Sequence, residues 1–310
     1  MRILVTGGAG YIGSVLVPAL LRAGHSVTVV DSFMYGQASL LDCCTDPNLT
    51  IVRADARDKR VVGELVSSAD AILPLACLTG APICAREPAA ATGTNLEAVR
   101  MLAESMSRDQ RLVFPSTNSG YGVGEADIYC DESTPLRPVS LYGRLKVEME
   151  SWLLDRGDAV TFRFATLFGT SPRMRLDLLV NDFAYRAVTD RFIVLFEPHF
   201  KRNYLHVRDA ARAFMHALDN YDAMTGRPFN VGLSDANLSK WELCERIQKR
   251  VPDFYFVASD IGEDPDKRNY IVSNARIEAT GFRPAFTLDA GIEELLKGYQ
   301  VIRRLAYANA

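Results

Sequence analysis

The sequence predicts an α/β protein in which a Rossmann-type doubly wound parallel sheet is followed by a smaller, mixed C-terminal lobe. Three observations indicate this fold. In the first half of the chain, short apolar runs alternate with segments long enough for helices. A glycine triplet follows the first run, and the alternation loosens after about residue 165. The first half is therefore expected to build the sheet.

Six short apolar runs supply the predicted strands. Their apolar residues stand at consecutive positions, whereas a strand with one wet face alternates apolar and polar residues. Such runs are typical of strands that helices cover on both faces, as in parallel sheets. The predicted strands are 2–6, 26–31, 49–55, 70–76, 111–114 and 160–165.

The second half of the chain has a different pattern. Residues 169–179 are loop-like, whereas 208–221 and 239–251 have the apolar spacing of amphipathic helices. We expect a first domain over residues 1–165, to which about 204–232 also return. The second lobe is expected over 166–310, interleaved with the first.

Composition and charge exclude several classes of partner. The 310 residues carry a net charge of -3 without a Lys/Arg block, so the positive surface that nucleic acid requires is missing. No apolar stretch approaches the roughly 20 residues that span a bilayer, and no export signal is recognisable. The six cysteines show no paired Cys-x-x-Cys spacing. We expect a cytoplasmic protein with reduced thiols, no metal and no membrane association.

The strongest local signal is the segment "VTGGAGYIGS", in which Gly7, Gly10 and Gly13 follow the first strand and precede a helical pattern. Glycines at this spacing permit a tight turn and let the backbone approach a pyrophosphate at a helix N-terminus. Asp31 ends the second strand, where a carboxylate can accept hydrogen bonds from a ribose 2'-hydroxyl. Since Ser32 and Phe33 add no cation for a 2'-phosphate, the pattern favours NAD over NADP.

The segment "LYGRLKVEMESWLL" places Tyr142 and Lys146 four residues apart on a helical pattern. That spacing puts both side chains on one face. Lowering a phenol pKa from about 10 to 7 requires roughly 4 kcal/mol of preferential stabilisation of the phenolate. A cation about 6 Å away supplies on the order of 3 kcal/mol at an effective dielectric near 20. The pair therefore predicts a tyrosine that acts as a base with help from a lysine.

Together, the glycine triplet, Asp31, Asp55, Thr117 and the Tyr142/Lys146 pair resemble the extended short-chain dehydrogenase/reductases that act on nucleotide sugars as epimerases, dehydratases or dehydrogenases. The resemblance implies that Tyr142 removes a proton from a sugar hydroxyl while NAD takes the hydride. It also implies that Lys146 holds the nicotinamide ribose and that Thr117 hydrogen-bonds the sugar oxygen. The implied cofactor-binding residues are Gly7, Gly10, Tyr11, Ile12, Gly13, Asp31, Ser32, Phe33, Asp55, Ala56, Leu75, Ala76, Cys77, Asn95, Tyr142 and Lys146.

The resemblance further implies a site for the sugar nucleotide, expected to carry UDP or GDP, and a homodimer. It assigns Arg202 to the substrate diphosphate, since a guanidinium suits phosphate oxygens. Thr166 stands where many relatives have an asparagine, and the segments "NSGYG" (118–122) and "GEDPDKRNY" (262–270) resemble those of the GDP-heptose 4-dehydrogenases. The predicted substrate-binding residues are Thr117, Asn118, Thr166, Arg173, Arg175, Asn181, Arg202 and Arg268.

The residues after Thr117 bear on the reaction. Sugar 4,6-dehydratases of this family commonly have an Asp-Glu pair there, whereas this chain has Asn118 and Ser119. We therefore expect no dehydratase activity. The favoured reaction is oxidation of a sugar hydroxyl, at C4, leading to epimerisation. Net dehydrogenation of the GDP-heptose type and reduction of a keto-sugar stay open as alternatives, as does a non-catalytic dinucleotide sensor.

Overall fold

A seven-stranded parallel sheet forms the centre of the computed structural model, which describes residues 1–125, 128–259, 261 and 268–302. The strand order is β11-β7-β5-β4-β1-β2-β3, and every neighbouring pair is parallel. The strands are β1 (Arg2–Thr6), β2 (Ser26–Asp31), β3 (Leu49–Arg53), β4 (Ala71–Pro74), β5 (Arg111–Thr117), β7 (Ala159–Phe164) and β11 (Arg227–Val231).

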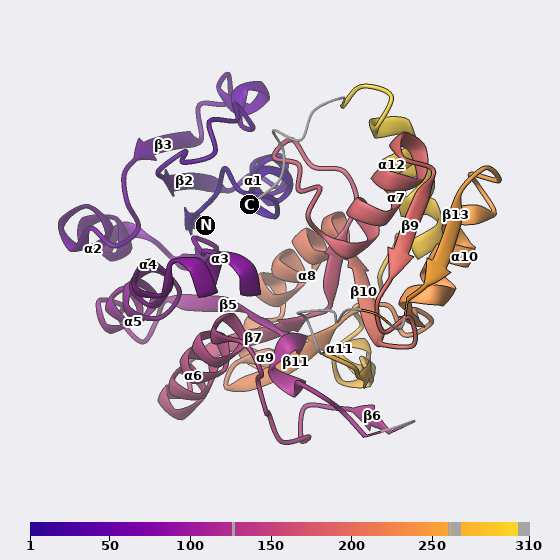
Figure 1. Cartoon of the computed structure of the whole chain (residues 1–310). Coiled ribbons are helices and arrows are strands. Elements are labelled where there is room, and N and C mark those ends of the chain that lie inside the picture. Colours follow the sequence, from indigo (N-terminus) through magenta and orange to yellow (C-terminus); the bar gives the residue numbers. More distant parts are fainter. Residues whose placement is uncertain (126–127, 260, 262–267, 303–310) are drawn as a thin grey trace.

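Helices cover both faces of this sheet (Figure 1). The core on one face joins alternate strand residues to α1 (Gly13–Arg22), α8 (Val207–Asp219) and α11 (Ala275–Ala279). The core on the other face joins the remaining strand residues to α2 (Lys59–Ser68), α3 (Ala81–Arg86), α5 (Ala98–Glu104) and α6 (Leu141–Arg156). Val113 thus packs on the first face, and Leu112 and Phe114 on the second. Burial on both faces explains why the apolar runs are continuous.

The C-terminal half adds smaller sheets and a third core. The short strands pair as β12 (Asn237–Ser239), β10 (Lys201–His206) and β8 (Thr166–Phe168), as β13 (Tyr255–Ala258) with β9 (Phe192–Leu195), and as β14 (Ile271–Val272) with β6 (Tyr129–Cys130). The third core joins α7 (Leu179–Thr189), α10 (Lys240–Gln248) and α12 (Leu288–Gly298), grouped at the right of Figure 1. Two short helices complete the description, α4 (Pro88–Thr92) and α9 (Tyr221–Met224).

Strand β11 was not among the predicted strands. Its sequence, Arg-Pro-Phe-Asn-Val, is too interrupted by Pro228 and Asn230 to read as an apolar run. The strand lies at the edge of the sheet, beside β7 only, where a proline is tolerated. The returning segment therefore contributes both α8 and an edge strand to the sheet.

Strand β5 is longer than predicted and ends at the cleft. Its pairing with β4 stops at Leu112, whereas its pairing with β7 continues to Thr117. Ser116 and Thr117 therefore extend beyond the end of β4, close to the switch between β1 and β4 where strand order reverses. Open α/β sheets bind their ligands at such a point.

Within the described ranges, no helix combines the length and apolar character needed to cross a bilayer. The same part of the chain contains no group of three His, Cys, Asp or Glu residues placed to hold a metal ion.

Candidate active site

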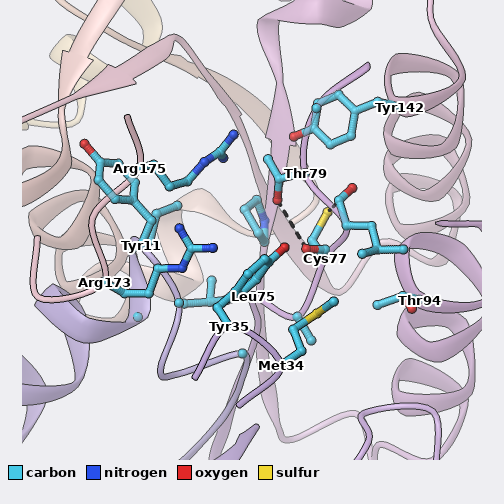
Figure 2. A pocket seen from close by; sticks show the side chains of 18 of the residues that line it. Tyr11, Met34, Tyr35, Leu75, Cys77, Thr79, Thr94, Tyr142, Arg173 and Arg175 are labelled. Carbon is cyan, nitrogen blue, oxygen red and sulfur yellow. Dashed lines mark hydrogen bonds between the residues drawn. The ribbon is translucent and has the colours of Figure 1, made fainter. Parts of the chain in front are cut away.

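A cavity of about 580 Å³ lies at the carboxyl ends of the central strands. Its walls come from the sheet on one side and from residues 164–178 on the other, with Arg268 added from far along the chain. Figure 2 shows the side chains of part of this lining. The predicted site residues that line it are Gly7, Gly10, Tyr11, Ile12, Gly13, Asp31, Ser32, Phe33, Asp55, Ala56, Leu75, Ala76, Cys77, Thr117, Tyr142, Lys146, Thr166, Arg173, Arg175 and Arg268.

The glycine triplet forms a cradle without side chains. Gly7 has φ +71°, and a Cβ there would lie 2.5 Å from the Ala76 backbone nitrogen. A Cβ on Gly13 would lie 2.5 Å from the Gly8 carbonyl oxygen. Helix α1 begins at Gly13, and its N-cap, Ile12, offers no side-chain acceptor. The open backbone and the uncapped helix N-terminus fit a pyrophosphate.

Two carboxylates lie beyond this cradle. Asp31 accepts hydrogen bonds from the Ala9 and Phe33 N–H groups at 2.9 and 2.8 Å, one on each oxygen. A carboxylate has about four acceptor positions, so Asp31 retains capacity for a ribose hydroxyl. Asp55 pairs with Arg57 at 2.6 Å, and this contact lowers the pKa of the Asp55 carboxyl. Both residues are placed where the resemblance implies the adenosine half of NAD.

The loop that follows β4 carries Leu75, Ala76 and Cys77 along the cavity. Asn95 does not line the cavity but lies beneath this loop, fully buried. Its Oδ1 accepts from the Leu78 N–H at 2.8 Å, and its Nδ2 donates to the Leu78 carbonyl at 2.9 Å. Asn95 therefore supports the loop from below.

The end of β5 presents a hydrogen-bonded chain of polar groups. Thr117 Oγ1 donates to Ser119 Oγ at 2.9 Å and accepts from the Ser119 N–H at 3.1 Å. Arg268 Nη1 donates to the same Ser119 Oγ. The Ser119 hydroxyl thus connects the Arg268 guanidinium to the predicted catalytic Thr117.

Helix α6 presents Tyr142 and Lys146 to the cavity. The lysine Nζ donates to the Pro115 carbonyl at 2.8 Å and lies 4.6 Å from the centre of the Phe114 ring. Burial raises the pKa of the Tyr142 phenol, and the cations that oppose this shift most are Arg175 and Arg268. Sequence reasoning had assigned that electrostatic role to Lys146.

Arg175 approaches Tyr142 from the opposite wall, as Figure 2 shows. Its guanidinium is held by an ion pair with Asp177, and its backbone carbonyl accepts from Asn181. The side chain is only 10% exposed. A fixed guanidinium beside the predicted base favours the phenolate form of Tyr142.

Three predicted substrate-binding residues do not line the cavity: Asn118, Asn181 and Arg202. The Asn118 amide is buried, and neither its Oδ1 nor its Nδ2 has a hydrogen-bond partner among the described residues. Asn181 is buried and holds Gly169 and Tyr11 instead. Arg202 is buried on β10, where it donates to the Lys201 carbonyl and lies 5.7 Å from the Tyr270 ring centre.

Several lining residues were not predicted. Tyr35, Arg57, Thr79 and Ser119 all line the cavity. Tyr35 and Arg57 lie within four residues of Asp31 and Asp55, so their proximity to the ends of β2 and β3 was the available signal. Ser119 follows Thr117 by two residues, but its contact with Arg268 spans 149 positions and leaves no local trace in the sequence.

Residues 3–232 match the NAD dependent epimerase/dehydratase family. The dTDP-glucose 4,6-dehydratase of Streptomyces niveus is 29% identical over 97% of this chain and 93% of its own length. UDP-glucuronic acid decarboxylase 1 of Arabidopsis thaliana is 26% identical over 97% of this chain and 70% of its own length. The UDP-glucose 4-epimerase of Thermus thermophilus, solved with NAD, superposes with a TM-score of 0.82 at 25% identity, over 97% and 99% of the two chains. These comparisons confirm the fold class, the family resemblance and the NAD dependence.

The expectation that dehydratase activity is excluded was wrong. A dehydratase is similar to this chain over nearly its whole length, and so is a decarboxylase. The physical reason lies in the site: groups from distant segments, such as Arg268 at Ser119, reach the end of β5. The identity of residues 118 and 119 alone therefore does not determine which polar groups meet the sugar at the end of β5.

Proposed function

Because the chain belongs to the NAD dependent epimerase/dehydratase family, we propose that it oxidises a hydroxyl of a nucleotide-activated sugar, at C4, by hydride transfer to NAD. One observation carries the proposal. The cavity that contains the glycine cradle and Asp31 also contains Thr117, Tyr142 and Lys146. Cofactor and sugar hydroxyl would therefore meet at the end of β5.

Each catalytic side chain has a distinct task in this proposal. Thr117 Oγ1 orients the sugar hydroxyl by a hydrogen bond, and the Tyr142 oxygen accepts the proton of that sugar hydroxyl. Arg175 favours the phenolate form of Tyr142. Lys146, whose Nζ donates to the Pro115 carbonyl, would hold the nicotinamide ribose, as the family resemblance implies. Bound NAD supplies the hydride acceptor. Arg268 lines the same cavity, and its guanidinium would bind anionic oxygens of the sugar nucleotide.

The similar proteins act on UDP- and dTDP-sugars by their names, which supports a nucleotide sugar as substrate. The proposed oxidation creates a ketone at C4. An epimerase returns hydride to the other face of C4 itself, whereas a dehydratase or a decarboxylase breaks a bond near the ketone that the ketone activates. Analysis of the reaction products identifies which of these reactions follows the oxidation. The homodimer, the cytoplasmic location and the division into domains stay predictions.

The test is a panel of UDP-, dTDP-, GDP- and CDP-sugars incubated with purified protein and NAD. Nicotinamide absorbance reports net reduction, and NMR of the products distinguishes a C4 epimer, a dehydrated keto-sugar and a decarboxylated sugar. Tyr142→Phe should lower turnover by about 10² to 10⁴-fold, because it removes the proton acceptor. Unchanged turnover in this variant would overturn the assigned mechanism. Tight NAD binding without turnover of any sugar would favour the dinucleotide sensor.

A further inference from the structure

Arg173 lies on the wall opposite the sheet, yet its contacts lead to the cofactor cradle. Its backbone N–H donates to Ser14 Oγ at 3.3 Å, and Ser14 is in the first turn of α1. Ser171, two residues earlier, bonds to the same hydroxyl at 2.8 Å and donates to the Tyr11 carbonyl at 2.8 Å. The side chain of Arg173 therefore begins beside the helix N-terminus that fits a pyrophosphate.

The guanidinium of Arg173 then extends to the end of β2. It lies 3.8 Å from the centre of the Tyr35 ring, and its Nη1 donates to the Met174 carbonyl at 2.8 Å. Tyr35 follows Asp31 on a loop that turns at Phe33, whose φ is +52°. Figure 2 shows Arg173 and Tyr35 side by side in the pocket. One side chain thus bridges the two elements expected to hold the pyrophosphate and the adenosine ribose.

The electrostatic setting also suits an anion. Arg173 is 2% exposed, and a second guanidinium, Arg175, is close enough to act on it. Burial and Arg175 together lower the pKa of Arg173, although Tyr35, Asp177 and Asp31 act in the opposite direction. A buried cation beside another cation is costly, and a dianionic group between the cradle and Arg173 would reduce that cost.

We propose that Arg173 is a cofactor-binding residue, which holds the pyrophosphate of NAD against the N-terminus of α1 while Tyr35 covers the outer face of its guanidinium. This reassigns Arg173 from the substrate, where sequence reasoning placed it. The inference rests on the NAD dependence of the family and is independent of the reaction proposed above. Guanidinium groups bind phosphate oxygens with two parallel hydrogen bonds, which a lysine cannot reproduce.

The test measures the affinities of NAD, ADP and adenosine for full-length protein stripped of NAD, by titration calorimetry. ADP carries the diphosphate, and adenosine lacks it. Arg173→Gln should weaken NAD and ADP by about tenfold to a hundredfold and leave adenosine within about twofold. Arg173→Lys should recover part of the loss. Tyr35→Phe should bind as the parent protein does, whereas Tyr35→Ala should lose about threefold to tenfold.

The control is Arg108→Gln, which removes an exposed arginine outside the cavity and should leave every affinity unchanged. Circular dichroism verifies that each variant is folded. If Arg173→Gln binds NAD and ADP normally but loses UDP or a UDP-sugar, Arg173 belongs to the substrate and the proposal is wrong. An equal loss of ADP and adenosine would also overturn it, because the effect would then come from a displaced loop. None of these readouts depends on turnover.

Discussion

The two walls of the cleft are built by different means. The sheet wall is shaped by backbone, since Gly7 and Gly13 leave no room for a Cβ. The opposite wall, residues 164–178, is shaped by buried side chains, among them Arg173 and Arg175. A backbone wall tolerates almost no substitution, whereas a side-chain wall can change its chemistry at constant shape. The difference predicts that the glycine wall is fixed and that the wall of residues 164–178 can vary.

The largest effect is expected on the backbone wall. Gly7→Ala would place a Cβ 2.5 Å from the Ala76 nitrogen at a φ of +71°, so the loop must move. We expect a loss of about 3 kcal/mol or more of unfolding free energy, together with loss of NAD binding. Urea unfolding and calorimetry measure the two quantities.

Gly24→Ala is the matched control for this prediction. Gly24 has φ +80°, but an added Cβ there meets nothing within 4 Å. Strain alone should cost about 1 kcal/mol, with normal NAD affinity. Equal losses of unfolding free energy in the two variants would show that the cost at Gly7 comes from its positive φ and not from the close approach to Ala76.

The second prediction concerns a variant that removes hydrogen bonds supporting the wall of residues 164–178. Asn181→Ala removes the acceptor of the Gly169 N–H and a donor to the Arg175 carbonyl, both in buried surroundings. About 2 kcal/mol of unfolding free energy should be lost, since buried polar groups are left without partners. The exposed Asn48→Ala should stay within about 0.5 kcal/mol of the parent in the same urea experiment. Similar values for both would mean that this wall does not depend on Asn181.

The third prediction concerns pH and the two walls together. Tyr142 acts as a base only when deprotonated, and burial raises its pKa whereas Arg175 lowers it. Turnover should therefore rise with pH, and Arg175→Gln should shift that rise to higher pH. At pH 7 we expect about tenfold lower turnover, the equivalent of one pKa unit. The measurement is a profile of kcat from about pH 6 to about pH 9.5, which follows the rising limb of the profile.

Arg186→Gln serves as the control for this profile, because Arg186 pairs with Asp182 on the exposed face of α7. Its profile should coincide with that of the parent protein. An Arg175→Gln profile reduced equally at every pH would contradict the electrostatic role and indicate lost binding alone.

The smallest effect is expected where the walls touch. Ser171→Ala removes the hydrogen bonds to Ser14 and to the Tyr11 carbonyl, at a partly buried position. The loss should be about 1 kcal/mol, within the usual range for intramolecular hydrogen bonds. Because Arg173 follows on the same segment, NAD affinity should fall slightly as well. No change in either stability or NAD affinity would show that the contact between the walls is dispensable.

The backbone wall could be predicted from sequence because its signals are local. The glycine triplet, the apolar runs and the Tyr142/Lys146 spacing each lie within a few consecutive residues. The strand ends differ slightly: β5 reaches Thr117 through Pro115, since its pairing with β7 continues after that with β4 ends. Strand β11 escaped prediction because its place is set by pairing with β7, a contact between distant parts of the chain.

The side-chain wall could be predicted only in part. Arg173 and Arg175 line the cavity and Arg202 does not, although the sequence predicted a substrate contact for all three, because nothing local distinguishes a cavity arginine from the buried Arg202 on β10. Asn118 follows Thr117 directly, and the short turn at Asn118–Tyr121 places its amide in the interior while Ser119 lines the cavity. The exclusion of a dehydratase was wrong for the same reason, because the cavity's polar groups are assembled from segments as distant as Thr117 and Arg268.

The hydrogen bonds of Ser171 to Ser14 and Tyr11 connect the wall of residues 164–178 directly to the start of α1. If a ligand orders one wall, these shared hydrogen bonds would reduce the entropy cost of ordering the other. Thermodynamic reciprocity then requires that, if bound dinucleotide raises the affinity of the protein for the sugar nucleotide, bound sugar nucleotide raises the affinity for the dinucleotide by the same factor. The hydrogen bonds of Ser171 thus give the two walls of the cleft a route by which a ligand on one wall can change the affinity for a ligand on the other.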